Sequence, residues 1–109
     1  MRAAGVRLAF GTDCGIPNVP HDSWAGGLVW FERAGLRPVE VIQLATGSAA
    51  ACIGRGSDVG TLVAGKLADL IAIDGDASEN LASLERVDWV MQGGRVVHAR
   101  WPTTDELRA

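Results

Sequence analysis

Cysteine is scarce in this chain of 109 residues, which contains only Cys14 and Cys52. The two lie 38 positions apart and belong to no Cys-x-x-Cys pair. That spacing excludes a disulfide framework and a zinc-ribbon site. Because free cysteine is among the most buried residue types, we expect both to be small, buried apolar residues.

Basic runs and long apolar runs are missing as well. The 13 acidic and 10 basic side chains give a net charge of -3 and are spread along the sequence. No row of Lys or Arg is available to neutralise phosphates, so we expect no nucleic-acid partner. The chain has no run of about 18 apolar residues and no charged segment leading into an apolar one. We therefore expect a cytoplasmic protein without a membrane partner.

The composition is nevertheless that of a folded protein. Hydrophobic residues make up 48% of the chain and the mean hydropathy is +0.15, which indicates one small domain with a buried core. A core of this size removes a smaller fraction of the surface from water than a larger one does. Marginal stability is the consequence, unless the chain has a partner surface.

The most informative local pattern lies near the start of the chain. Residues 6–10 are apolar apart from Arg7 and end at Gly11, which predicts a strand buried on both faces, as in a parallel sheet. The polar loop at 11–21 follows it, where parallel α/β folds carry their chemistry. In that loop, Asp13 is suited to bind a divalent metal or to take a proton from metal-bound water. The motif by itself also fits a turn or helix-capping aspartate.

A helix is predicted after this loop, capped by Asp22 or Ser23 and ending near Gly35. Its apolar positions recur at intervals of four and three, which is typical of a helix face that packs on a core. These positions are Trp24, Leu28 and Phe31.

A second helix is predicted to open at Pro38, a residue tolerated in the first turn. Residues 46–48 (Thr-Gly-Ser) should interrupt it. A third, short helix over 49–53 should stop at Gly54.

The second part of the chain has the texture of a β-structure from residue 59 onward, with short β-prone runs separated by glycine. The last two runs flank a glycine-containing turn at 92–94 and predict a hairpin. The predicted strands are 70–73, 87–91 and 95–98.

Other polar residues in this part favour structural roles. Lys66 is expected to be a solvated turn lysine, and Asp74 and Asp76 to flank a glycine turn. The tail at 100–109 has little apolar content and is expected to be mobile. The single parallel-type strand at 6–10 would leave both its edges unpaired, and this predicts missing sequence upstream.

Several segments resemble the amidohydrolase superfamily in one collinear order. Residues 5–15 are similar to the last barrel strand of that family, and 38–46 to the helix that follows it. The most specific resemblance is that of residues 60–71 to the segment that enters the family's small β-sandwich. Residues 94–97 resemble the closing strand of that sandwich. Among members, the spacing from Asp13 to His21 is most similar to the branch of imidazolonepropionase and prolidase-like hydrolases.

The resemblance implies an α/β fold: the end of a (β/α)8 metallo-hydrolase barrel over 1–57, part of an accessory β-sandwich over 58–99, and a tail. It further implies that Asp13 is both a metal ligand and the catalytic carboxylate that takes a proton from the attacking water. The metal would be zinc or another divalent ion. The reaction implied is hydrolysis of a carbon–nitrogen bond in a small-molecule amide, cyclic amide or dipeptide-like substrate.

The sequence departs from the family pattern in its histidines. The His-x-His pair, the bridging lysine or carboxylate and two further histidines belong upstream and are absent, so only His21 and His98 remain. His98 falls in the predicted hairpin, where a structural or surface role is expected. His21 is a candidate substrate-binding residue, with a solvent-exposed loop histidine as the alternative.

Two hypotheses follow. In the first, the chain is the C-terminal fragment of a metal-dependent amidohydrolase, inactive and without bound metal on its own, and its partner is the missing N-terminal part. In the second, it is a non-catalytic structural module that self-associates to cover its exposed edges.

Overall fold

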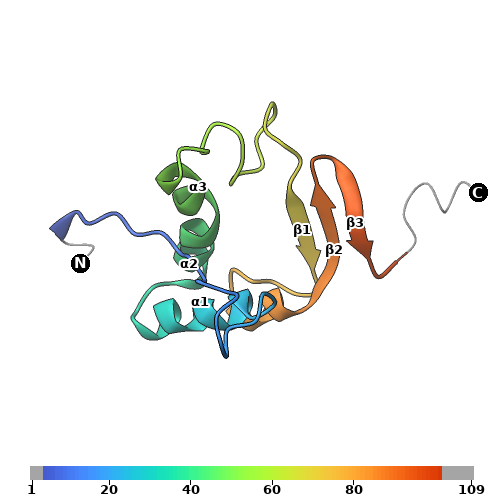
Figure 1. The fold of residues 1–109 in the computed structure, drawn as a ribbon. Helices are drawn as coiled ribbons and strands as arrows, with labels where there is room; N and C mark the ends of the chain where they lie inside the picture. Colours follow the sequence, from blue (N-terminus) through green and yellow to red (C-terminus); the bar gives the residue numbers. More distant parts are fainter. Residues whose placement is uncertain (1–3, 102–109) are drawn as a thin grey trace, which may run out of the picture.

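The computed structural model describes residues 4–101 and shows a helical region followed by a small sheet (Figure 1). Part of the predicted tail, residues 102–109, lies outside the described residues. The elements in chain order are α1 (Trp24–Arg33), α2 (Pro38–Gln43), the π-helix η2 (Leu44–Ser48), α3 (Ala49–Cys52), β1 (Leu70–Ile73), the 3-10 helix η3 (Leu81–Glu85), β2 (Val87–Gln92) and β3 (Arg95–Ala99).

The strand predicted at 6–10 is not formed. This segment is extended but pairs with no strand of the described chain. Its contact with the helical region is made by Phe10, whose backbone N–H donates to the Leu44 carbonyl over 3.1 Å. The prediction fails for a physical reason: a parallel strand needs a neighbour, and residues 4–101 supply none beside it.

α1 forms as predicted. Leu28 is fully buried, and Trp24 and Phe31 pack against the same core. Ser23 occupies the N-cap position, but its hydroxyl donates to the Pro20 carbonyl over 2.7 Å and does not cap the helix. The helix ends just before Gly35, which has a φ of 93°.

Pro38 opens α2, as predicted, but the break expected at 46–48 is absent. The chain continues through η2 into α3 without leaving helical geometry. The wider π turn contains Thr46, Gly47 and Ser48, the weak helix formers that predicted an interruption. A loop packs closely on this turn, because a Cβ at Gly60 would lie 2.6 Å from Ala50 Cβ and 3.0 Å from the Thr46 carbonyl.

The sheet has the strand order β1-β2-β3 with both pairings antiparallel. β2 and β3 form the predicted hairpin through Gly93 and Gly94, whose φ angles are 56° and 80°. Two consecutive positive φ values suit a two-residue hairpin turn and favour glycine. The predictions for all three strands are confirmed, with ends shifted by no more than one residue.

One core joins the two regions. Leu28 and Val41 come from the helices, and they pack with a second group contributed by η3 and the turn before it. That second group comprises Ala77, Leu81 and Leu84. No local pattern predicts η3, because its apolar residues fit neither a helical nor a strand period over so short a span.

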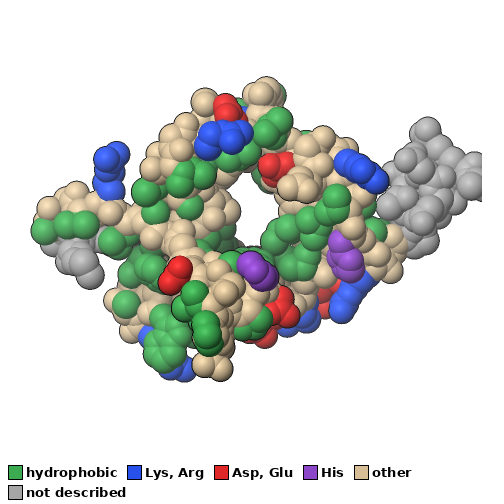
Figure 2. All heavy atoms as spheres, viewed as in Figure 1, with side chains coloured by type: hydrophobic (Ala, Val, Ile, Leu, Met, Phe, Trp, Pro, Cys, Tyr) green, Lys and Arg blue, Asp and Glu red, His purple; other side chains and the backbone are tan. Residues whose placement is uncertain are grey.

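The rest of the space between the two regions is open. A cleft of about 1130 Å³ separates the helices from the sheet, and it is visible as an opening through the molecule (Figure 2). Its wall is mainly apolar and includes Trp24 and Ile42 on one side and Ile71 and Val90 on the other.

Two sequence-based expectations about single residues are wrong. Cys52 is exposed, at the end of α3, where it lines a second cleft of about 690 Å³ beside residues 6–9. Lys66 is not a solvated turn lysine, since it is half-buried and donates to three oxygens. The acceptors are the Gly56 carbonyl at 2.6 Å, Thr61 Oγ1 at 2.6 Å and the Val59 carbonyl at 3.3 Å.

Candidate functional site

Asp13 lies in the loop between the extended segment and α1. Its side chain is exposed, and it makes no hydrogen bond or ion pair with any of residues 4–101. Its φ is 49°, in the left-handed region that few non-glycine residues adopt, although aspartate tolerates it better than most. Next to it, Thr12 Oγ1 accepts a hydrogen bond of 3.2 Å from the Cys14 backbone N–H. The turn is thus held by its neighbours and leaves the Asp13 carboxylate available.

His21 returns to the same turn. Its Nδ1 lies 3.3 Å from Cys14 Sγ, which makes a thiol–imidazole hydrogen bond. Gly15 lies beneath the imidazole, and a Cβ there would be 3.4 Å from His21 Cε1 and Nε2. The loop between them is braced by a hydrogen bond of 2.9 Å from the Gly15 N–H to the Val19 carbonyl. Cys14 itself is half-buried.

This contact brings Asp13, Cys14 and His21 onto one short loop, as the sequence predicted for Asp13 and His21. The pairing of Cys14 with His21 was missed. Seven residues separate the two, and only the turn at Gly15, with its φ of 92°, folds the loop back on itself. A glycine between a cysteine and a histidine was the only available signal.

The Asp13 loop supplies part of what a metal ion needs. Asp13 offers one free carboxylate, and carboxylate oxygens are ligands of divalent metals. Nowhere in residues 4–101 do three His, Cys, Asp or Glu side chains gather as a ligand set. A catalytic zinc usually takes three protein ligands. The described residues thus fit one ligand position and do not form a whole metal centre.

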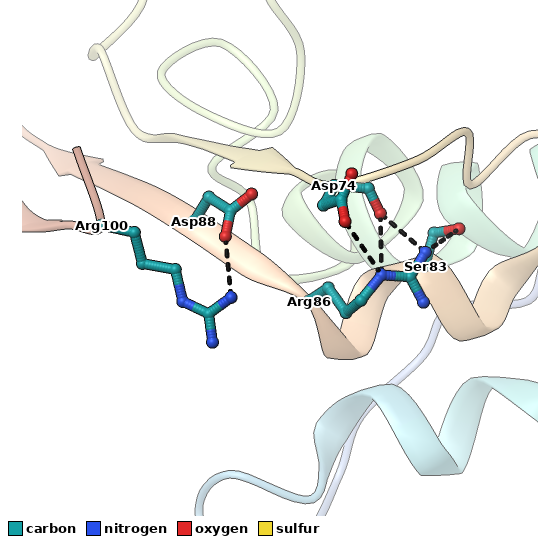
Figure 3. A network of polar contacts seen from close by, with 5 residues as sticks. All are labelled: Asp74, Ser83, Arg86, Asp88 and Arg100. Carbon is teal, nitrogen blue, oxygen red and sulfur yellow. Dashed lines mark hydrogen bonds and ion pairs between the residues drawn. The ribbon is translucent and has the colours of Figure 1, made fainter.

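Asp74 and Asp76, which flank Gly75, both take part in hydrogen bonds within the chain. Asp76 Oδ1 accepts hydrogen bonds from the Ser78 hydroxyl and N–H, which lower the pKa of the Asp76 carboxyl. Asp74 lies against Arg86, whose Nε and Nη2 donate to the Asp74 carbonyl at 3.1 and 2.8 Å (Figure 3). The predicted turn around Gly75 is confirmed.

His98 lies in β3 opposite Val90 and is exposed. Asp88 of β2 forms an ion pair of 3.1 Å with Arg100, which directly follows β3 (Figure 3). His98 therefore has the surface position expected of it, on a strand of the sheet. Asp13 lines neither of the two clefts described above.

Comparison with known proteins gives a consistent result. The amidohydrolase family model matches residues 1–97. An imidazolonepropionase of Shouchella clausii is 35% identical over 102 residues, which cover 89% of this chain and 23% of that protein. One from Aromatoleum aromaticum is 43% identical over 74 residues, covering 64% of this chain and 17% of that protein.

The structural comparison agrees. The crystal structure of a Xaa-Pro dipeptidase with bound methionine in its active site superposes with a TM-score of 0.81 at 33% identity. The match covers 90% of this chain and 24% of the dipeptidase chain. The matched residues thus span between 17% and 24% of the length of these three proteins. No helix within residues 4–101 is long and apolar enough to cross a membrane.

The family match extends over almost the whole chain, and the similar proteins include imidazolonepropionases and a dipeptidase, the branch that the loop spacing suggested. The chain belongs to the amidohydrolase family.

Proposed function

We propose that this chain forms the C-terminal part of a metal-dependent amidohydrolase that hydrolyses carbon–nitrogen bonds in a small-molecule amide, cyclic amide or dipeptide-like substrate. The relatives named imidazolonepropionase and Xaa-Pro dipeptidase support this substrate class. In this proposal residues 1–57 complete a barrel, 58–99 belong to an accessory β-sandwich and 100–109 form a tail. The whole enzyme would be cytoplasmic.

The observation that carries the proposal is the free carboxylate of Asp13. It follows an extended segment, it is exposed, and no described side chain competes for it. Asp13 would serve as a metal ligand and would take a proton from the attacking water and return it to the leaving group. A carboxylate placed for proton transfer contributes about 10²- to 10⁴-fold to a rate.

The implied metal, zinc or another divalent ion, would lower the pKa of bound water and polarise the scissile carbonyl. Its remaining ligands would come from the missing N-terminal part of the enzyme, because residues 4–101 offer a single free position. His21 would lie at the rim of the same site and contact the substrate through Nε2, since Nδ1 already faces Cys14.

A second candidate function is a non-catalytic module that self-associates. The observation in its favour is the amount of exposed apolar surface, including Ile53, Leu62 and Val63 with 74%, 83% and 59% of their surface exposed. Large exposed apolar patches mark interfaces. Sedimentation of the 109-residue chain separates the two readings: an oligomer supports the module, whereas a monomer supports the enzyme part.

The direct test joins this chain to the rest of an amidohydrolase. In a hybrid enzyme, it would replace the matching segment of the Shouchella clausii imidazolonepropionase, to which it is 35% identical. We expect the hybrid to bind metal and to turn over the imidazolonepropionase substrate. D13N should lower turnover by about 100-fold or more, because it removes the proton acceptor.

D22N is the matched control, since Asp22 is an exposed aspartate of the same loop without a hydrogen bond to the described residues. It should leave turnover unchanged. Equal activity of D13N and D22N hybrids would contradict the proposal. The 109-residue chain alone is expected to bind no stoichiometric zinc, and metal analysis showing one tightly bound zinc per chain would count against the assignment of the other ligands to missing sequence.

A further inference from the structure

Phe10 fastens the segment that carries Asp13 to the helical region. Its N–H donates to the Leu44 carbonyl over 3.1 Å. Among the described residues, this is the one backbone–backbone hydrogen bond that links residues 4–13 to the rest of the chain. Three residues beyond it stands Asp13.

The acceptor of this bond lies in an unusual turn. Leu44 is the first residue of η2, the π-helix inside an otherwise α-helical run from Pro38 to Cys52. Single π turns within α-helices occur frequently at functional sites. Here the turn begins with the carbonyl that receives the Phe10 N–H, so the irregularity coincides with the attachment point of the Asp13 segment.

The Phe10 side chain is held by a different helix. Its ring meets Phe31 edge to face, with centroids 5.8 Å apart and planes at 77°. On the same helix, α1, Gly27 leaves room for the ring: a Cβ there would lie 3.3 Å from Phe10 Cε2 and Cζ. Phe10 is therefore fixed from two sides, through its N–H by η2 and through its ring by α1.

We propose that Phe10 is a positioning residue for Asp13, with Gly27 and the Leu44 carbonyl as the two surfaces that locate it. Beyond Phe10, the Thr12 side chain accepts from the Cys14 N–H and closes the turn in which Asp13 lies. The direction of the carboxylate is set by this turn, and the location of the turn is set by Phe10. The catalytic consequence rests on the function proposed above.

The chain contains a matched pair of positions for a test. Gly26 and Gly27 are neighbours inside α1, and alanine raises helix propensity equally at both. A Cβ at Gly26 meets nothing within 4 Å, whereas one at Gly27 meets the Phe10 ring. G26A and G27A thus differ in whether they disturb Phe10.

The first measurement uses amide hydrogen exchange and NMR spectra of the full 109-residue chain. G27A should speed exchange of the Phe10 amide by roughly tenfold and shift the Asp13 amide signal, while G26A should match the wild type in both. F10L should weaken the attachment without any clash, and F10L combined with G27A should restore part of the lost protection. If G27A and F10L both leave the exchange rate of the residue-10 amide and the position of the Asp13 signal as in G26A, the proposal is overturned.

The second measurement uses the hybrid enzyme. G27A should lower kcat several-fold with little change in KM, and G26A should leave both unchanged, because a displaced carboxylate impairs proton transfer more than substrate binding. The two proposals fail separately. Unchanged turnover in D13N would remove the proposed function, whereas a large loss in D13N with identical kcat for G26A and G27A would remove the positioning role alone.

Discussion

The aspartates of the two regions of this molecule differ in what they bind. Those of the described second region, 58 to 88, all have a partner inside the chain: Asp58, Asp69, Asp74, Asp76 and Asp88. The two in the loop before α1, Asp13 and Asp22, have none among residues 4–101. A carboxylate that folding leaves unpartnered is available to a ligand, and one that bridges backbone and side chains is part of the scaffold.

Basic residues brace the second region as well. Lys66, the only lysine of the chain, donates hydrogen bonds to three oxygens of its own loop. Arg86 donates to the Asp74 carbonyl and to the Ser83 hydroxyl. In the helical region, polar contacts are fewer and the structure depends on the packing of α1 and on the attachment of Phe10. The second region is thus a polar-braced support, and the first carries the candidate chemistry.

The largest effect is expected from L28A, which tests whether the two regions are one cooperative unit. Leu28 is fully buried in the core shared by α1, α2 and η3. Its truncation should lower the free energy of unfolding by about 2–5 kcal/mol, measured by urea denaturation. Helix and sheet signals should be lost in a single transition. L62A is the control, because Leu62 is 83% exposed and should change stability little. A sheet that survives loss of the helices would mean that the regions fold independently.

A smaller effect is expected from K66M, which keeps the length of the side chain and removes the charge-assisted hydrogen bonds to the Gly56 and Val59 carbonyls and to Thr61. The expected loss is about 1.5–3 kcal/mol of unfolding free energy. Turnover per folded hybrid enzyme should stay the same, because Lys66 belongs to the support. A K66M hybrid that keeps its stability but loses activity would contradict this division.

The smallest effect is expected from acid. The Ser57 hydroxyl and then Arg55 lower the pKa of Asp58, and the hydroxyl and N–H of Ser78 lower that of Asp76. Since the folded-state pKa of each is below the unfolded value of about 3.9, their stabilisation is present above that pH and is lost as the pH falls through the folded-state pKa. In urea unfolding, the D58N/D76N double variant should lose less stability than the wild type between about pH 5 and pH 2. Parallel pH profiles would show that the two carboxylates do not contribute.

Much of this division could be predicted from the sequence. The helical spacing of Trp24, Leu28 and Phe31 predicted α1, and the β-prone runs on either side of Gly93 and Gly94 predicted the hairpin, because both signals are local and periodic. The position of Asp13 after an apolar segment also predicted its place on an exposed loop. These features depend on neighbours within a few residues.

The remainder depends on contacts that no local pattern encodes. The strand at 6–10 failed because its pairing partner is not among the described residues. The role of Lys66 depends on oxygens five to ten residues away, and the Cys14–His21 hydrogen bond on a glycine turn between them. Cys52 is exposed because the short helix α3 turns it toward a cleft and away from the core.

The most direct test of the difference between the two kinds of aspartate compares D13N with D69N in the hybrid enzyme. Asp69 Oδ1 accepts a hydrogen bond of 2.6 Å from the Gly93 N–H, whereas Asp13 has no such contact within residues 4–101. Turnover and melting temperature would be measured on the same samples. We predict that D13N loses about 100-fold or more in kcat at an unchanged melting temperature, and that D69N melts earlier but keeps its kcat. A D13N enzyme that melts earlier and retains its turnover would contradict the account.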